Sequence, residues 1–161
     1  MPAARTIPAV DDIDLQLIAL LRQDARLPAA VLASRLGVSR GTVANRLRRL
    51  EDEGVITGRV ALVDAEKAGM GLSVFIFIRT SNHDPGWLKK FHDAVAGLPE
   101  ITGVYRMTGD LDYVLRARIA DVKAYDRLYQ RLIARVPLSD VSASFVMEEI
   151  KYTTAIPLEM R

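Results

Sequence analysis

A short basic helix that directly follows a glycine turn constrains the fold of this chain most. In residues 39–50 (SRGTVANRLRRL), Val43, Leu47 and Leu50 recur at the spacing of one helical face. The opposite side carries arginine, threonine and asparagine but no acidic residue. Ser39 is a favoured N-cap residue. The sequence therefore predicts an amphipathic helix with one side in a core and a cationic side in solvent.

Another short helix precedes this one. Residues 28–36 have helical spacing of apolar side chains and end at Gly37, which suits the left-handed position after a helix. Two short helices joined by a three-residue turn containing glycine form a helix-turn-helix unit, whose second helix enters the major groove of DNA. A helix that begins at Asp11 or Asp12 is expected to support both. The sequence therefore predicts a DNA-binding domain.

Eight residues of this unit are candidates for contact with DNA. Arg40 can pair with guanine, Asn45 can pair with adenine, and the methyl group of Thr42 can contact that of thymine. The later arginines are expected mainly to hold phosphates, although Arg46 could instead anchor the helix to a carboxylate. The alternative is a solvated surface helix, because short motifs are often false positives. The candidates are Ser39, Arg40, Gly41, Thr42, Asn45, Arg46, Arg48 and Arg49.

Charge is segregated along the chain. The formal net charge of +2 is too small to indicate a nucleic-acid partner by itself. Residues 61–161 hold thirteen basic and thirteen acidic residues, whereas residues 34–50 hold five arginines and no carboxylate. A basic patch on a nearly neutral protein is what a groove-facing helix requires.

Composition excludes several kinds of site. Cysteine is absent, which removes disulfides, cysteine nucleophiles and thiolate zinc sites. The two histidines, His83 and His92, are expected at the surface, so we predict no metal and no cofactor. No uncharged stretch of 18 residues exists. We therefore expect no membrane partner and a cytoplasmic, nucleoid-associated protein.

The segment after the basic helix suggests a wing and a linker. Two short β-branched runs, around residues 55–56 and 59–63, flank Thr57 and Gly58, which is consistent with a small hairpin. The expected organisation is a flexible arm at residues 1–9, a winged helix-turn-helix domain at 10–60, a linker at 61–70 and a second domain at 71–161.

The second half of the chain has the pattern of a ferredoxin-like domain. Its predicted elements, in the order βαββαβ, are Leu72–Arg79, Pro85–Leu98, Ile101–Thr108, Tyr113–Ile119, Val122–Ile133 and Val141–Ile150. Both helices would cover one face of the sheet, which makes the whole chain an α+β protein. The other face would expose apolar residues and favour a dimer or larger assembly. These residues are Phe75, Phe77, Tyr105, Leu115, Phe145 and Met147.

The chain resembles the Lrp/AsnC (leucine-responsive, feast/famine) transcriptional regulators over residues 10–161. The matching stretches are DLQLIALL from Asp14, DAR from Asp24, LGVS from Leu36, RLRRLE from Arg46, GVITG from Gly54, TGDLDYVL from Thr108, DVKAY from Asp121 and VMEEIK from Val146. The resemblance implies a winged helix-turn-helix joined to an effector-binding domain of the RAM type. It also implies dimers paired through their sheets, commonly four dimers in a ring that wraps DNA.

In that family small effectors, often amino acids, bind beside a Gly-Asp-x-Asp turn, which is residues 109–112 here. Glycine permits close approach, and a carboxylate can meet an ammonium group. Two aspartates that merely cap a hairpin are an equally simple explanation. Ser142 and Ser144 could contribute from a neighbouring chain. The candidates for effector binding are Tyr105, Met107, Thr108, Gly109, Asp110, Asp112, Ser142 and Ser144.

The predicted function is therefore a sequence-specific regulator that binds a pseudo-palindromic operator on double-stranded DNA and senses an amino acid. One rival is a small enzyme on the ferredoxin-like half, but no nucleophile–base pair or metal cluster is visible in the sequence. The other rival is an architectural protein that wraps DNA without an effector. We predict no catalytic residue.

Overall fold

The computed structural model describes residues 9–82 and 84–158, and the chain divides into two compact units. Among the described residues, the first unit contains 9–61 with 152–158, and the second contains 62–151. Residues 152–158, which we predicted to belong to the second domain, form no helix or strand and cluster with the first unit. The predicted arm, apart from Ala9, and His83 lie outside the described residues.

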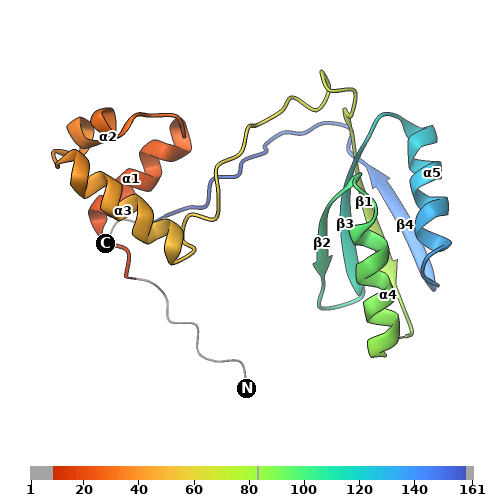
Figure 1. Ribbon diagram of the computed structural model, residues 1–161. Coiled ribbons are helices and arrows are strands. Elements are labelled where there is room, and N and C mark those ends of the chain that lie inside the picture. The colour runs from red at the N-terminus through yellow and green to blue at the C-terminus, as the bar shows by residue number, and fades with distance from the viewer. Residues whose placement is uncertain (1–8, 83, 159–161) are drawn as a thin grey trace. The chain divides into compact units, whose positions relative to one another are not determined.

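The first unit is a bundle of three helices (Figure 1). They are α1 (Asp12–Gln23), α2 (Ala29–Leu36) and α3 (Arg40–Asp52). Its core contains Leu17, Leu32, Val43 and Leu50, each at most 1% exposed. Gly37 ends α2 with a φ of 66°, a left-handed conformation that favours glycine. The predicted helix-turn-helix is confirmed.

The two short strands of the predicted wing are not formed at residues 55–63. The backbone N–H groups of Val55 and Ile56 both donate to the carbonyl oxygen of Leu50, at 2.9 Å each. These residues therefore close the end of α3 and pack on its core instead of starting a hairpin. Val60 and Leu62 are 81% and 78% exposed, so the second run has no packing partner in the described chain.

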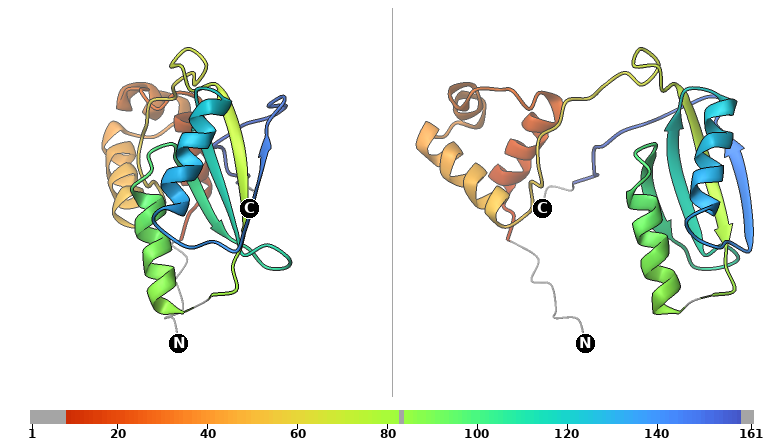
Figure 2. Two further views of the ribbon diagram at one scale, coloured as in Figure 1. Left: turned by 90° about the vertical axis from the view of Figure 1, so that its right-hand side faces the viewer. Right: turned by 45° about the vertical axis from the view of Figure 1, so that its right-hand side comes forward.

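The second unit is a four-stranded antiparallel sheet with the order β2-β3-β1-β4. Figures 1 and 2 show that both helices cover the same face of the sheet. Its elements are β1 (Leu72–Arg79), α4 (Pro85–Ala96), β2 (Ile101–Arg106), β3 (Tyr113–Ile119), α5 (Val122–Ile133) and β4 (Asp140–Phe145). The order βαββαβ and this strand arrangement confirm the ferredoxin-like prediction.

The face of the sheet that lacks helices differs from the prediction at two residues. Leu115 is fully buried, because it lies on β3 with the core residues Ala117 and Ile119. The ring of Phe145 meets that of Tyr125 on α5 at 5.3 Å and 83°, so it too faces the helices. The predicted outward positions of these two residues are wrong.

Strand β4 ends at Phe145 and not at Ile150. Val74 of β1 pairs with Phe145, and the N–H of Val146 still donates to the carbonyl of Ser73 at 2.9 Å. Because β1 begins at Leu72, only one of its residues lies beyond Ser73, so β4 has almost no strand left to pair with after Val146. Met147 is 99% exposed.

Candidate DNA-binding and effector sites

Helix α3 presents one side to the core and the other to solvent. Val43 and Leu50 are fully buried, whereas Arg40, Asn45 and Arg48 are exposed. None of these three side chains has a hydrogen bond or ion pair within residues 9–82 and 84–158. Arginine and asparagine are the side chains that read guanine and adenine in pairs of hydrogen bonds. This surface therefore offers free donors and acceptors to a ligand.

The first turn of α3 is fixed by its own side chains. The Ser39 hydroxyl accepts a hydrogen bond from the N–H of Thr42 at 3.0 Å, and the two hydroxyl oxygens are 2.9 Å apart. Ser39 therefore acts as the N-cap. At Gly41 a Cβ atom would meet only the Ser39 hydroxyl, at 3.7 Å. Packing therefore does not require glycine at this position. Without a side chain, Gly41 adds no bulk to the exposed face at the first turn of α3.

A buried ion-pair cluster joins α3 to α1. Asp14 is 0% exposed and binds the guanidinium groups of both Arg46, at 2.8 Å, and Arg49. Arg46 also pairs with Asp11 at 2.7 Å, and Arg49 donates to the carbonyl of Ala9 at 2.9 Å. These ion pairs connect α3 to α1 and so fix the orientation of α3, although both arginine side chains remain partly exposed.

This cluster changes the role that we assign to Arg49. We predicted from the sequence that Arg49 holds a phosphate, but its guanidinium is bound to Asp14, Glu53 and Ala9. For Arg46, the alternative of anchoring to a carboxylate is what the structure shows. A signal was available in the sequence, because Asp14 lies three residues before Leu17 on the apolar stripe of its helix.

Asp11 makes this cluster sensitive to pH. The hydrogen bond from Arg46 is the main reason that the pKa of Asp11 lies below its usual 3.8, and the Asp14 N–H lowers it further. A carboxyl whose folded pKa is lowered stabilises the fold above its unfolded pKa, and this contribution disappears as pH falls through the folded pKa. We expect the stability difference between wild type and Asp11→Asn to shrink below a pH of about 4.

Urea unfolding at pH 7 and pH 3, followed by circular dichroism, measures this difference. Asparagine retains the N-cap function of Asp11 but cannot ionise, so only the charge is removed. A difference between the two proteins that stays the same at both pH values would contradict the prediction.

The second candidate site is the turn between β2 and β3. Gly109 has a φ of 103°, a backbone conformation that is strained for any residue with a side chain, although a Cβ atom there would meet no neighbour. The Asp112 carboxylate accepts a hydrogen bond from the N–H of Thr80 at 2.8 Å, and its own N–H donates to the Ile78 carbonyl at 3.0 Å. Asp112 thus ties the turn to β1. Asp110 is exposed, and its carboxylate has no hydrogen bond or ion pair within the described part of the chain.

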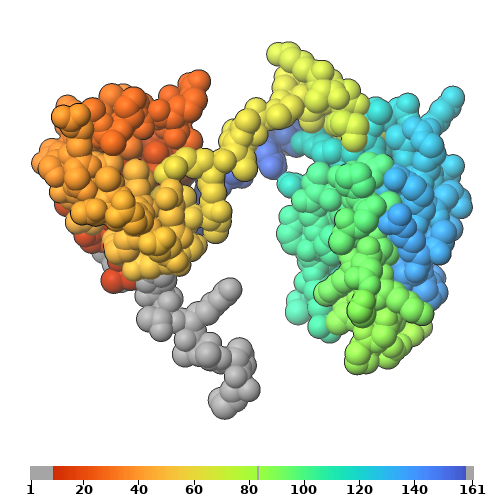
Figure 3. All heavy atoms as spheres, viewed as in Figure 1, coloured from red at the N-terminus to blue at the C-terminus, as the bar shows by residue number. Residues whose placement is uncertain are grey.

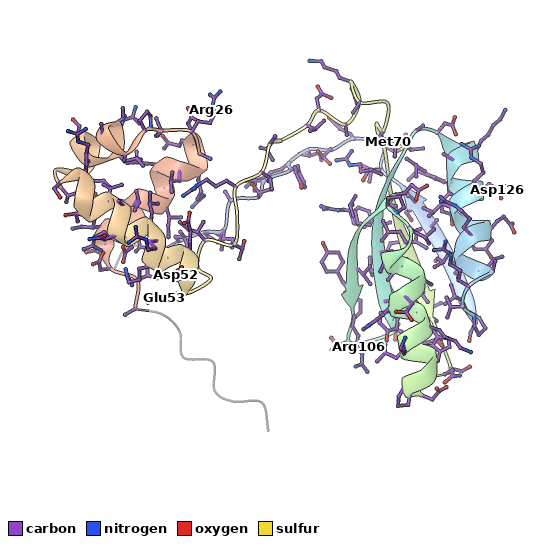
Figure 4. The ribbon with its side chains drawn as sticks, viewed as in Figure 1. Arg26, Asp52, Glu53, Met70, Arg106 and Asp126 are labelled. Atoms are coloured by element: carbon purple, nitrogen blue, oxygen red, sulfur yellow. The ribbon has the colours of Figure 1, made fainter. Side chains whose placement is uncertain are left out.

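Arg79, the last residue of β1, was not among the residues predicted for this site. Its Nε donates to the carbonyl of Asp110 at 2.9 Å, and its Nη1 pairs with Asp140 at 2.9 Å. The sequence did contain a signal for Arg79, because a charged residue ends an otherwise apolar strand. Figure 4 labels a further cation, Arg106, at the end of β2 beside the turn. The turn therefore combines cationic side chains with the free carboxylate of Asp110.

Three other predicted effector residues, Tyr105, Ser142 and Ser144, lie on the sheet face that lacks helices, but in two different rows. Tyr105 pairs with Val114, Val114 with Phe77, and Phe77 with Ser142, which places all four side chains in one row across the sheet. Tyr105 is on one edge strand and Ser142 on the other, roughly 14 Å apart at the usual strand spacing. Ser144 lies beside Phe75 in the next row. Met107 and Thr108 are exposed next to the turn.

Two further features of the described residues bear on function. No helix within residues 9–82 and 84–158 is long and apolar enough to cross a membrane. The same residues contain no group of three or more histidine, cysteine, aspartate or glutamate side chains that could hold a metal ion.

Both halves of the chain match known families. Residues 10–57 match the family model described as "Winged helix-turn-helix DNA-binding". Residues 73–156 match the one described as "Lrp/AsnC ligand binding domain". Together the two matches cover most of both units.

Relatives match the chain over nearly its whole length. The DNA-binding transcriptional activator DecR of Escherichia coli is 46% identical over 151 residues, which is 93% of this chain and 99% of the relative. An AsnC family transcriptional regulator from Agrobacterium tumefaciens has a TM-score of 0.88 and 43% identity, covering 91% of this chain and 96% of that chain. The regulator NMB0573 of Neisseria meningitidis, solved with L-methionine, has a TM-score of 0.87 and 29% identity, covering 92% and 97%.

Proposed function

The chain belongs to the Lrp/AsnC family of transcriptional regulators, and we propose that it recognises a specific DNA sequence with α3 and binds an amino acid as its effector. The observation that carries the first half is the exposed, unpaired side of α3. Arg40 and Asn45 would address base edges, with Thr42 and Gly41 between them. Arg48 would hold a phosphate, while Arg46 and Arg49 position the helix.

Salt dependence tests this division of roles. Each phosphate that a cation neutralises contributes about 0.9 to the slope of log K against log salt concentration. We expect Arg48→Ala to weaken binding to specific and random DNA alike and to reduce this slope by about 0.9. Fluorescence anisotropy at several salt concentrations measures it.

Arg49→Ala is the matched control, because it removes an equal charge from the neighbouring position. Since its guanidinium is already paired with Asp14 and Glu53, we expect it to lower the melting temperature and to change the salt slope less than Arg48→Ala does. A larger change of slope for Arg49→Ala than for Arg48→Ala would reverse the assignment.

The proposed effector site is the turn at residues 109–112. Asp110 would receive the ammonium group, and Arg106 would receive the carboxylate. Support for an amino acid comes from the solved complex of NMB0573 with L-methionine. Effector binding would act on transcription by favouring one state of the assembly over another.

A thermal-shift screen of the full-length protein against the twenty amino acids tests the effector. A ligand that binds only the native state raises the melting temperature. We expect at least one amino acid to do so, and we expect Asp110→Ala to weaken this shift. No shift with any amino acid, together with equal affinity for random and operator DNA, would favour the architectural alternative.

We also propose that the protein acts as a dimer that assembles further, into the ring of four dimers that the family resemblance implies. The support is the sheet face that carries Phe75, Phe77 and Tyr105, which no helix of the second unit covers. Two-fold pairing would present two α3 helices to half-sites about one helical turn apart, and so to a pseudo-palindromic operator in the cytoplasm.

A further inference from the structure

A cavity of about 550 Å³ lies in the first unit, between α3 and the residues that precede α1. Its lining includes Asp11, Arg46 and Arg49, together with Thr42 and Asn45, which are proposed to address base edges. Figure 3 shows α3 on the surface of the first unit that is turned to the viewer. The cavity therefore lies directly beside the part of the helix that is proposed to meet DNA.

Arg46 uses only one of its three nitrogens for its ion pairs. Its Nη1 donates to both carboxylate oxygens of Asp11, at 2.8 and 2.7 Å, and to one oxygen of Asp14 at 2.8 Å. Because this nitrogen carries two hydrogens, three acceptors compete for two donors. The Nη2 and Nε atoms of Arg46 have no partner within residues 9–82 and 84–158. Arg46 therefore retains donors for a further anion.

Arg49 is less available than Arg46. Its Nη1 donates to the Ala9 carbonyl at 2.9 Å and to Glu53 at 3.3 Å, and its Nη2 binds Asp14. Figure 4 labels Glu53, the residue that follows the last turn of α3. Since both terminal nitrogens of Arg49 are occupied, Arg46 is the guanidinium in this cavity that can bind another group.

The two carboxylates on Arg46 differ in exposure. The Asp14 side chain is 0% exposed, whereas that of Asp11 is 55% exposed. An exposed ion pair is weak because water solvates both partners, and a buried pair is costly to break. An incoming anion can therefore replace Asp11, while Asp14 continues to hold α3. The cluster has three carboxylates and two guanidinium groups, so the charge of Asp11 also opposes that anion.

We propose that this cavity receives a backbone phosphate of DNA, which takes the place of Asp11 on Arg46. In the free protein the Asp11 carboxylate occupies the position of the phosphate and so lowers the affinity for DNA. The Nε and Nη2 atoms of an arginine lie side by side, which suits two parallel hydrogen bonds to a phosphate. This inference rests on the proposed function, because it adds a contact to the DNA that α3 binds.

Fluorescence anisotropy of the whole chain with a duplex selected from a random DNA library tests the proposal. We expect Asp11→Asn to bind roughly two- to fivefold more tightly than wild type, the range to which an exposed ion pair corresponds. Asparagine retains the N-cap and removes the charge. Asp12→Asn is the matched control, because it removes the same charge from the neighbouring exposed position, and its gain should be smaller. In an Arg46→Gln background, Asp11→Asn should bring no gain.

A second measurement applies even where Arg46→Gln fails to fold. Versions of the selected duplex that carry one uncharged methylphosphonate at successive backbone positions remove single phosphate charges. On one of them wild type should bind more weakly, and Asp11→Asn should lose its advantage. Equal gains by Asp11→Asn and Asp12→Asn, or an advantage that persists on every duplex or without Arg46, overturn the phosphate site and leave the proposed function in place. A wild-type protein that binds no DNA overturns both.

Discussion

Asp14→Ala is expected to unfold the helical unit far more readily than any surface substitution. The side chain is 0% exposed and binds Arg46 and Arg49, so its removal leaves two guanidinium groups beside an apolar core. Breaking a buried pair costs about 3–5 kcal/mol, and we expect about 3 kcal/mol here because both arginines still reach solvent. Binding to DNA should be lost with the orientation of α3.

Two spectroscopic probes can assign this loss to the right unit. The only tryptophan, Trp87, packs in the second unit against Phe91 and Tyr113, so its fluorescence reports that unit. Urea unfolding followed by circular dichroism should show an earlier loss of helix in Asp14→Ala, while the tryptophan transition remains in place.

Asp12→Ala is the matched control for this substitution. It removes the same charge two residues away, on an exposed position of the same helix, where substitutions usually change stability by about 0.5 kcal/mol or less. If both variants lose stability equally, the effect comes from charge near the start of α1, and the cluster has no special role.

The helix-turn-helix could be predicted from sequence because its signals are local. Ser39 and Gly37 act within a few residues of where they stand, and the buried stripe of α3 follows a simple period. The ion-pair cluster could not be predicted as a whole. Asp14 and Arg46 are separated by 32 positions, so their contact depends on how α1 and α3 cross. The spacing of the arginines in the sequence is therefore compatible with two roles, contact with phosphates and anchoring of α3 to α1.

The second unit shows where the strand period loses information. Alternation along β3 assigns residues to two faces, but only the helices of the complete fold decide which face is the core. For this reason Leu115 was predicted on the exposed face and lies on the buried one. Similarly, the end of β4 depends on where β1 begins. At the turn, Gly109 was recognisable from its type, whereas Arg79 reaches it only because β1 and β3 are neighbours in the sheet.

Asn45→Ala is expected to relax the choice of base at one position of the operator without weakening binding to random DNA. The side chain is exposed on α3, six residues after the Ser39 cap, where an amide can make two hydrogen bonds to adenine. Losing such a pair costs about 1–3 kcal/mol, which corresponds to roughly 5- to 150-fold in discrimination.

Selection of binding sites from a random DNA library, for wild type and variant in parallel, measures this change directly. One position in each half-site should lose its preference, and the salt slope should stay constant because no phosphate contact is removed. Arg48→Ala serves as the comparison, since it should lower affinity while keeping the selected sequence. If the Asn45→Ala protein selects the wild-type sequence, α3 reads the operator through other side chains. Arg40 would then be the next residue to substitute.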